Sequence, residues 1–265
     1  MSLLNEIKRL YGCRAIIAAM AVHELKARYA GTLAGSLWAI VNPLITILVY
    51  WFVFSVGLKV KPMGDVPFIL FFSVGLIPWT TFSEALTLNA NAVVGNAYLV
   101  KKMVFPTEVL PLVNILAGLI VHVIMVALVT LIFLAYGFPV TVFNLQFAYY
   151  LFALTVFSTG LSWFVAALNV FQRDIGLIIG VALNIWFWLT PVVYGVEVLP
   201  PKYLFFARLN PMFYIIEGYR NSFLYGVPFW HGWKTGIYFW SLSLSALYLG
   251  ALFFRRFKND FAEVL

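Results

Sequence analysis

The chain has 265 residues, of which 63% are hydrophobic and 10% are charged, and its formal net charge is +7. Soluble domains carry about 25% charged residues, so this composition excludes an ordinary water-soluble protein and predicts one that lies partly in lipid. Its basic residues flank apolar runs, which is typical of membrane topology signals rather than of a nucleic-acid-binding surface. The one cysteine, Cys13, excludes a disulfide within the chain and a CxxC metal site.

Residues 1–33 predict a cytoplasmic helix that lies on the inner leaflet. Apolar side chains recur there at helical spacing, first at Leu3, Leu4, Ile7, Leu10 and Tyr11, with basic residues largely off that stripe. This is the pattern of an amphipathic helix at a membrane surface. A basic tail that only sets topology is the alternative. The segment has no compact apolar block, so we expect no cleavable signal peptide.

Six apolar stretches are long enough to form membrane helices, because a spanning helix needs roughly 20 apolar residues. They cover about residues 34–57, 67–90, 109–136, 147–170, 175–195 and 236–254. The sequence therefore predicts an all-α integral membrane protein with six transmembrane helices in a single domain, residues 1–265.

The distribution of lysine and arginine predicts that both ends of the chain lie in the cytoplasm. With the N-terminus inside, the cytoplasmic segments hold 11 of the 17 basic residues and the outer segments hold 6. Positive charge favours the cytoplasmic side of a membrane. The cytoplasmic segments are then 1–33, 91–108, 171–174 and 255–265.

The stretch NAYLVKKMVFPTEVLPL, residues 96–112, interrupts the apolar sequence between the second and third spans. Its two lysines would cost about 5–7 kcal/mol at the centre of a bilayer, so they belong at the membrane surface. Proline disfavours a helical conformation in the residue before it, so the Phe105–Pro106 pair predicts a helix end. We expect a short interfacial helix followed by a turn. From charge alone, a plain basic connector explains the stretch equally well.

Residues 196–235 are too long for a turn and too short for two spans. Prolines and aromatic residues alternate with polar ones there, and Glu217 and Arg220 are spaced to form an i,i+3 pair. Irregular backbone at membrane depth survives only when it is buried in protein or lines a wet cavity. The segment predicts two short re-entrant or interfacial helices near the outer mouth; an extracellular loop lying on the bilayer is the alternative.

The sequence offers little for a catalytic site. The three histidines fall in three separate regions without metal-ligand spacing, and the chain lacks a phosphate-binding loop, so no ATP site is predicted. Glu84 and His122 lie inside spans, where an ionisable residue is a functional candidate. Neither has a partner in the pattern, and we favour structural hydrogen bonds over a proton relay for both.

Five segments together resemble the permease subunit of the ABC exporters for O-antigen, capsule and teichoic acid polysaccharides, the Wzm-type permeases. The matching segments are ELKARYAGTLAGSLWAIVNPL at 24–44, GLIPWTTFSEAL at 75–86, the stretch at 96–112, FQRDIG at 171–176 and LNPMFYIIEGYRNSFLYG at 209–226. The resemblance implies a homodimer in the bacterial cytoplasmic membrane, with two copies of an ABC ATPase subunit on its cytoplasmic face. ATP and Mg would be held by that partner, which leaves this chain without a cofactor, and a lipid-linked polysaccharide would be the substrate.

The resemblance also implies a coupling helix within residues 91–108, through which the ATPase acts on the membrane part. The expected coupling residues are Tyr98, Leu99, Lys101, Lys102, Met103, Phe105, Pro106 and Glu108, with Arg173 and Asp174 as a second contact or a structural pair. Exposed charges contribute about 1 kcal/mol or less each, so the apolar members are expected to anchor the ATPase. The lysines are expected to set topology and to meet lipid headgroups.

Aromatic residues make up 18% of the chain. Rings along a conduit hold sugar faces without a fixed hydrogen-bond pattern, which suits a sliding polymer, although rings also form interface belts and fill helix packing. The expected channel-lining residues, in spans one and five, are Tyr50, Trp51, Trp186 and Tyr194. The expected outer-gate residues are Phe213, Tyr214, Glu217 and Arg220.

Three other functions remain open from the residues. One is an exporter permease for drugs or lipids. The second is an integral-membrane transferase that acts on lipid-linked sugars. The third is an interaction subunit without a conduit. A transporter subunit should co-purify with an ATPase, whereas a transferase should turn over by itself.

Overall fold

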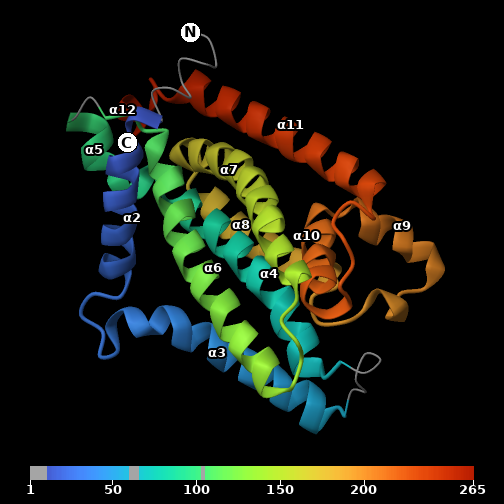
Figure 1. Ribbon diagram of the computed structural model, residues 1–265. Helices are drawn as coiled ribbons and strands as arrows, with labels where there is room; N and C mark the ends of the chain where they lie inside the picture. Colours follow the sequence, from blue (N-terminus) through green and yellow to red (C-terminus); the bar gives the residue numbers. More distant parts are fainter. Residues whose placement is uncertain (1–10, 60–65, 103–104) are drawn as a thin grey trace.

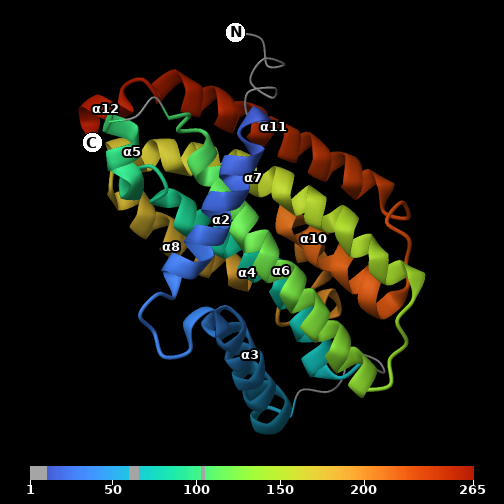
Figure 2. The same ribbon diagram turned by 60° about the vertical axis from the view of Figure 1, so that its left-hand side comes forward.

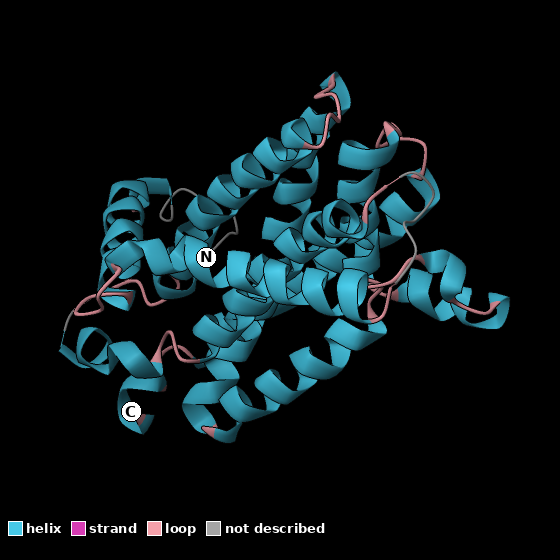
Figure 3. Cartoon of the chain, turned by 90° about the horizontal axis from the view of Figure 1, so that it is seen from below, coloured by secondary structure: helices cyan, strands magenta, loops and turns pink. Residues whose placement is uncertain are grey.

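The computed structural model describes residues 11–59, 66–102 and 105–265, and within these ranges the regular elements are helices (Figures 1 and 3). The longer helices are α2 (Arg14–Arg28), α3 (Trp38–Trp51), α4 (Phe68–Ala90), α6 (Val109–Ala135), α7 (Phe147–Phe171), α8 (Asp174–Leu189) and α11 (Trp233–Phe257). The shorter ones are α5 (Ala97–Lys102), α9 (Pro201–Leu209), α10 (Pro211–Arg220) and α12 (Phe261–Val264).

Helix α4 is the central helix of the bundle. It contacts α6, α7, α8 and α10, and most of its side chains are buried. Bulky apolar residues lie on all its sides, among them Phe71, Phe72 and Trp79. A helix that is apolar all round is stable only where other helices or lipid surround it. The sequence of α4 therefore places it at the core, and the neighbouring helices are arranged around it (Figure 2).

Helices α7 and α11 form the closest helix pair in the bundle. Gly160 of α7 and Gly250 of α11 face each other so closely that a Cβ atom at either position would overlap the backbone of the other helix. Small residues at such a crossing let two membrane helices approach to backbone contact. The pair runs side by side along one face of the molecule in Figures 1 and 2.

Helix α3 lies apart from the main bundle (Figures 1 and 2). It begins after a 3₁₀ turn at Gly35–Leu37 and continues into a π-helical segment, Phe52–Gly57. Its main attachment is a stack of aromatic rings on α4. The ring centroids of Tyr50 and Phe72 are 4.6 Å apart, and those of Phe54 and Phe68 are 5.2 Å apart. Ile45, Leu48 and Val49 on α3 are exposed, so they would face lipid or another chain in a membrane.

Five helical segments in the described part of the chain are long and apolar enough to cross a membrane. They are Gly35–Gly57, Phe68–Ala90, Val109–Ala135, Val142–Phe171 and Trp233–Phe257, and they match five of the six predicted spans. The prediction of an all-α membrane protein is confirmed.

The predicted fifth span, 175–195, differs in the structure. Helix α8 has 16 residues and ends at Leu189, because Thr190 is extended and Pro191 follows it. A residue before proline avoids the helical region. At a rise of 1.5 Å per residue α8 is about 24 Å long, less than the roughly 30 Å hydrocarbon core. The helix we expected to continue through Pro191 stops before it, and a six-span topology stays a prediction.

The N-terminal arm contains the predicted helix in its described part, and its position at the inner leaflet stays a prediction. The predicted stripe within residues 1–10 lies outside the described residues. Helix α2 is formed, but its apolar side chains Ile17 and Met20 pack against Val109 and Val113 of α6. Protein therefore covers one face of α2.

Residues 196–235 contain the predicted pair of short helices, α9 and α10, which confirms that this segment is not a plain loop. Asn210 caps α10 by accepting a hydrogen bond from the backbone N–H of Met212 at 3.0 Å. A left-handed residue, Gly226 with φ of 62°, ends the helical part before the chain turns into α11. This conformation favours glycine, which has no Cβ.

Candidate functional site

The polar stretch after α4 forms the short helix that the sequence predicts. The chain leaves α4 at Ala90 and passes through a 3₁₀ turn, Val94–Asn96, into α5. Tyr98 is 66% exposed and Lys101 is exposed, while Leu99 is half-buried. These side chains are therefore accessible on the surface of the helix. Met103 lies outside the described residues, and the structure does not describe the side chain of Lys102.

The end of this stretch points into the protein rather than outward. Phe105 packs with the cluster that α2 and α6 share. Pro106 supplies the carbonyl that accepts the first backbone hydrogen bond of the turn into α6, from Val109 at 3.0 Å. Glu108 is buried, and its carboxylate pairs with Lys258 after α11. Phe105 and Glu108 thus attach the end of the stretch to the bundle, and their contact with an ATPase stays a prediction.

The second expected contact, Arg173 and Asp174, is an exposed turn between α7 and α8. The backbone N–H of Gly176 donates to Oδ1 of Asn169 at 2.9 Å and so closes the turn. Asp174 lies in the first turn of α8, where a negative charge is favoured by the helix dipole. The residue pair is thus both accessible and locally stabilised.

The four expected channel residues lie on α3, on α8 and in the segment that follows α8. Tyr50 stacks on Phe72, as described above, and Trp51 is half-buried nearby on α3. Trp186 and Tyr194 line a separate cavity of about 550 Å³, together with Tyr203 of α9. The rings on α3 and α8 are joined in one hydrophobic cluster, because the ring centroid of Phe187 on α8 lies 6.3 Å from that of Tyr50, and Trp79 contacts both Phe187 and Trp186.

Trp186 is also held by contacts within the chain. Its indole N–H donates to Oδ1 of Asn210 at 2.8 Å, and its ring meets Phe82 edge-on at 5.1 Å. Tyr194 donates to the backbone oxygen of Trp188 at 3.0 Å. These contacts fix both aromatic rings at the wall of the cavity.

The predicted Glu217–Arg220 pair is formed on α10. Nη1 of Arg220 lies 2.7 Å from Oε1 of Glu217, and Nη2 donates to the backbone oxygen of Val192 at 2.9 Å. The guanidinium carbon lies 3.6 Å above the ring of Phe71 on α4. A Cβ at Gly75 would come within 3.2 Å of Nη2, so the glycine leaves room for the buried arginine.

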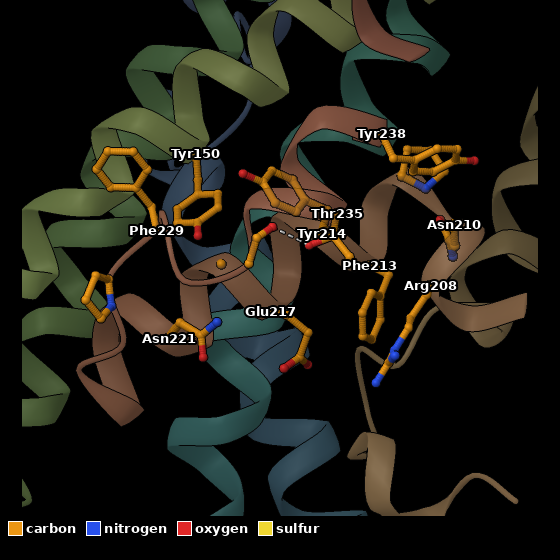
Figure 4. A pocket seen from close by; sticks show the side chains of 14 residues that line it. Tyr150, Arg208, Asn210, Phe213, Tyr214, Glu217, Asn221, Phe229, Thr235 and Tyr238 are labelled. Carbon is orange, nitrogen blue, oxygen red and sulfur yellow. Dashed lines mark hydrogen bonds between the residues drawn. The ribbon is translucent and has the colours of Figure 1, made fainter. Parts of the chain in front are cut away.

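The other three expected gate residues, Phe213, Tyr214 and Glu217, line one pocket beside α11 (Figure 4). The hydroxyl of Tyr214 lies 3.0 Å from that of Tyr149 on α7, which in turn accepts from the indole of Trp240 at 2.8 Å. Helix α10 is therefore attached to α4 through Arg220 and to α7 and α11 through Tyr214.

Both ionisable residues within the spans have partners. Nδ1 of His122 lies 2.7 Å from the hydroxyl of Thr81, and its Nε2 lies 2.7 Å from the hydroxyl of Tyr219. Glu84 lies 4.0 Å from the guanidinium of Arg28, so the expectation that Glu84 is isolated was wrong. His122 thus links α4, α6 and α10 by hydrogen bonds.

The family of the chain follows from comparison with known proteins. The ABC-2 type transporter family matches residues 16–224, which include α2 to α10. The chain belongs to the ABC-2 type transporter family. Membership confirms a multi-pass protein of the inner membrane and the membrane subunit of an ABC transporter, and it implies an ATPase partner.

Three relatives are each named O-antigen export system permease protein RfbA. A protein of Klebsiella pneumoniae is 26% identical over 91% of this chain and 92% of its own length. A second from the same organism is 27% identical over the same shares. A protein of Myxococcus xanthus is 31% identical over 83% of this chain and 85% of its own length. The resemblance to the Wzm-type permeases is thereby confirmed.

Sequence reasoning missed one polar feature of this ABC-2 chain, which we call the amide network: Asn89, Asn91, Asn114, Ser162 and Asn169. The buried amide of Asn89 donates to Ser162 at 2.9 Å and accepts from Asn114 at 3.0 Å. Asn169 donates to Asn91 at 3.2 Å. The network joins α4, α6 and α7 just before the chain enters α5. Asparagines inside apolar spans were the signal that could have revealed it, since buried amides need partners.

Proposed function

We propose that this chain is the permease subunit of an ATP-driven exporter that moves a lipid-linked polysaccharide across the cytoplasmic membrane. The polymer is of the O-antigen, capsule or teichoic-acid type. The observation that carries the proposal is the similarity to proteins named as O-antigen export permeases over 83% to 91% of the chain. The chain itself acts as a conduit and not as an enzyme.

Two copies of the chain form the conduit in this proposal. Helices α3 and α8 carry exposed apolar side chains, including Leu48 on α3 and Val181 and Ile185 on α8, and Phe52 is exposed in the π-helical segment after α3. Such surfaces need lipid or a second chain to cover them. A dimer built on these helices would bring the ring groups around Tyr50 and Trp51 of one copy toward those of Trp186 and Tyr194. The channel would then be lined by aromatic faces.

Energy enters through two ATPase subunits on the cytoplasmic face, which bind ATP and Mg. Helix α5 is the coupling helix, with Tyr98 and Leu99 as the anchors in a groove of the ATPase. The exposure of Tyr98 supports this assignment. The turn at Arg173 and Asp174 is the second contact.

The outer gate is the region around α10. Movement of this helix would open the conduit, because α10 connects the buried Arg220 contact on α4 with the Tyr214 contact on α7. The pocket at Phe213, Tyr214 and Glu217 lies at the side of this gate.

Deletion of the chain in its native host tests the proposal. Surface polysaccharide, measured by immunoblotting of whole cells, should disappear while the lipid-linked polymer accumulates in the cytoplasm. Re-expression should restore export, and an ATPase partner with a substituted phosphate-loop lysine should not support it. Unchanged surface polymer with impaired drug or lipid efflux would favour the other exporter function. Elongation of a lipid-linked sugar by the purified chain without the ATPase would favour a transferase.

A further inference from the structure

Helix α12, the last helix of the chain, buries its first side chain completely. Phe261 is 0% exposed, and its ring lies 5.2 Å from Phe254 of α11 and 6.0 Å from Phe171 at the end of α7. A four-residue helix has too few internal hydrogen bonds to be stable alone. Helix α12 is therefore held in place by packing, and Phe261 is its anchor.

The cluster that receives Phe261 also receives the coupling segment. Val93 before α5 is fully buried in it, and Val100 of α5 packs against it. Helices α5 and α12 contact each other directly and lie side by side in Figures 1 and 2. The position of α5 is thus determined partly by residues more than 150 positions later in the chain.

A second, polar connection joins the same two regions. Nζ of Lys258, between α11 and α12, donates to Oε1 of Glu108, the last residue of the coupling segment 91–108. The side chains are 25% and 10% exposed, so the pair is largely screened from water. The indole of Trp163 donates to the backbone oxygen of Glu108 at 3.0 Å. Both ends of the coupling segment are therefore fixed, the first by apolar packing and the second by this ion pair.

We propose that residues 258–265 are a clamp that positions the coupling helix α5 for its ATPase partner. Phe261 and Lys258 are positioning residues that act through α5 and Glu108. An ATPase that pushes on α5 can move the membrane-spanning helices only if α5 is held firmly at both ends. A loosely held α5 would move without them. The clamp supplies that rigidity, and it joins α5 to α11 and α7. The proposal rests on the proposed function in one respect, that an ATPase contacts α5.

The first test compares Phe261→Ala with Phe261→Leu in the full-length chain, purified in detergent with its ATPase partner. Phe261→Ala should lower the amount of co-purified ATPase, or the polymer exported per ATP hydrolysed, by about tenfold, because the ring is fully buried. Phe261→Leu should restore most of the loss, because it refills the apolar site. Phe205→Ala on α9 is the matched control, because that ring is 65% exposed and at the other end of the bundle.

The second test exchanges the charges of the ion pair and remains informative if Phe261→Ala fails to fold. Lys258→Glu and Glu108→Lys should each lower the export per ATP hydrolysed, and the double variant should recover it. Only the side chains change, so the Trp163 hydrogen bond to the backbone of residue 108 is retained. Arg256→Glu, an exposed reversal on the same stretch, should leave the ratio unchanged.

Two results would overturn the clamp. The first is that Phe261→Ala captures the ATPase and couples export to ATP hydrolysis as well as the wild-type chain does. The second is that the double charge exchange does not restore what each single charge variant loses. ATPase capture needs no polymer, so it is measured for the charge variants as well, and its outcome is separate from the fate of the proposed polysaccharide substrate. If the chain captures the ATPase but exports another substrate, the proposed clamp stands and the proposed polysaccharide substrate is wrong.

Discussion

At the scale of single residues, Arg220 shows how this chain tolerates a charge in its interior. The guanidinium is balanced by the carboxylate of Glu217, a backbone carbonyl at Val192 and the face of Phe71. Each partner comes from a different part of the chain or from the preceding helical turn. Removal of one member of a buried pair leaves the other charge uncompensated and costs about 3–5 kcal/mol.

We therefore expect Arg220→Ala to lower the thermal stability of the purified permease and to reduce export. Arg220→Lys should be only slightly better, because an ammonium group cannot reach Glu217 and Val192 with the same fork of donors. The melting temperature in detergent, followed by size-exclusion chromatography, checks the change. Arg208→Ala is the control, because Arg208 is exposed on α9. Equal melting temperatures for the two alanine variants would contradict this role.

At the scale of elements, α7 and α11 depend on two glycines for their contact. A Cβ on Gly250 would overlap the backbone oxygen of Gly160. Backbone atoms cannot move aside as a flexible side chain does, so the helices would have to separate.

Gly250→Leu should therefore destabilise the bundle by about 1–3 kcal/mol or more, the range for overpacking a well-packed site. Thermal unfolding of the purified chain measures this. Gly118→Ala on α6 is the control, because a Cβ there meets no atom within 4 Å. Equal melting points for the two variants would show that the α7–α11 contact is more adaptable than its geometry indicates.

The coupling helix gives a second prediction at this scale. Tyr98→Ala with Leu99→Ala should abolish ATPase capture or uncouple export from ATP hydrolysis while membrane insertion is kept, since buried apolar anchors dominate such contacts. Lys101→Ala with Lys102→Ala should be milder, because exposed charges contribute about 1 kcal/mol or less. Co-purification and ATPase assays separate the two pairs. The assignment of anchors is wrong if the lysine pair alone removes the ATPase.

At the scale of the whole molecule, the uneven distribution of basic residues predicts that both ends face the cytoplasm. An odd number of spans would place the two ends on opposite sides, so this prediction requires α8 and the segment after it to make a sixth crossing.

In a chain with Cys13 replaced, single cysteines at Asn5, Tyr98 and Ala262 should resist an impermeant thiol reagent added outside. Cysteines at Pro62 and Val140 should react. Labelling in intact cells, with permeabilised cells as the control, measures both sets. If the reagent added outside labels both Asn5 and Ala262, the two ends lie outside and the predicted topology is wrong.

The sequence by itself determined what depends on local composition. Long apolar runs can be stable only in lipid, so the membrane class and five spanning helices could be predicted from them. The helix before Pro106 and the Glu217–Arg220 pair involve neighbours in the chain, and both are found. The end of α8 before Pro191 also has a local cause, because the residue before a proline avoids the helical region.

Only the tertiary structure decided which distant residues meet. Nothing in the pattern pairs Glu108 with Lys258, His122 with Tyr219, or Asn89 with Ser162. Spans that are apolar on every side do not indicate which face meets which neighbour, because lipid and protein solvate such faces almost equally. The packing of whole helices determines which helices are neighbours. The few polar groups then form hydrogen bonds or ion pairs across these helix contacts.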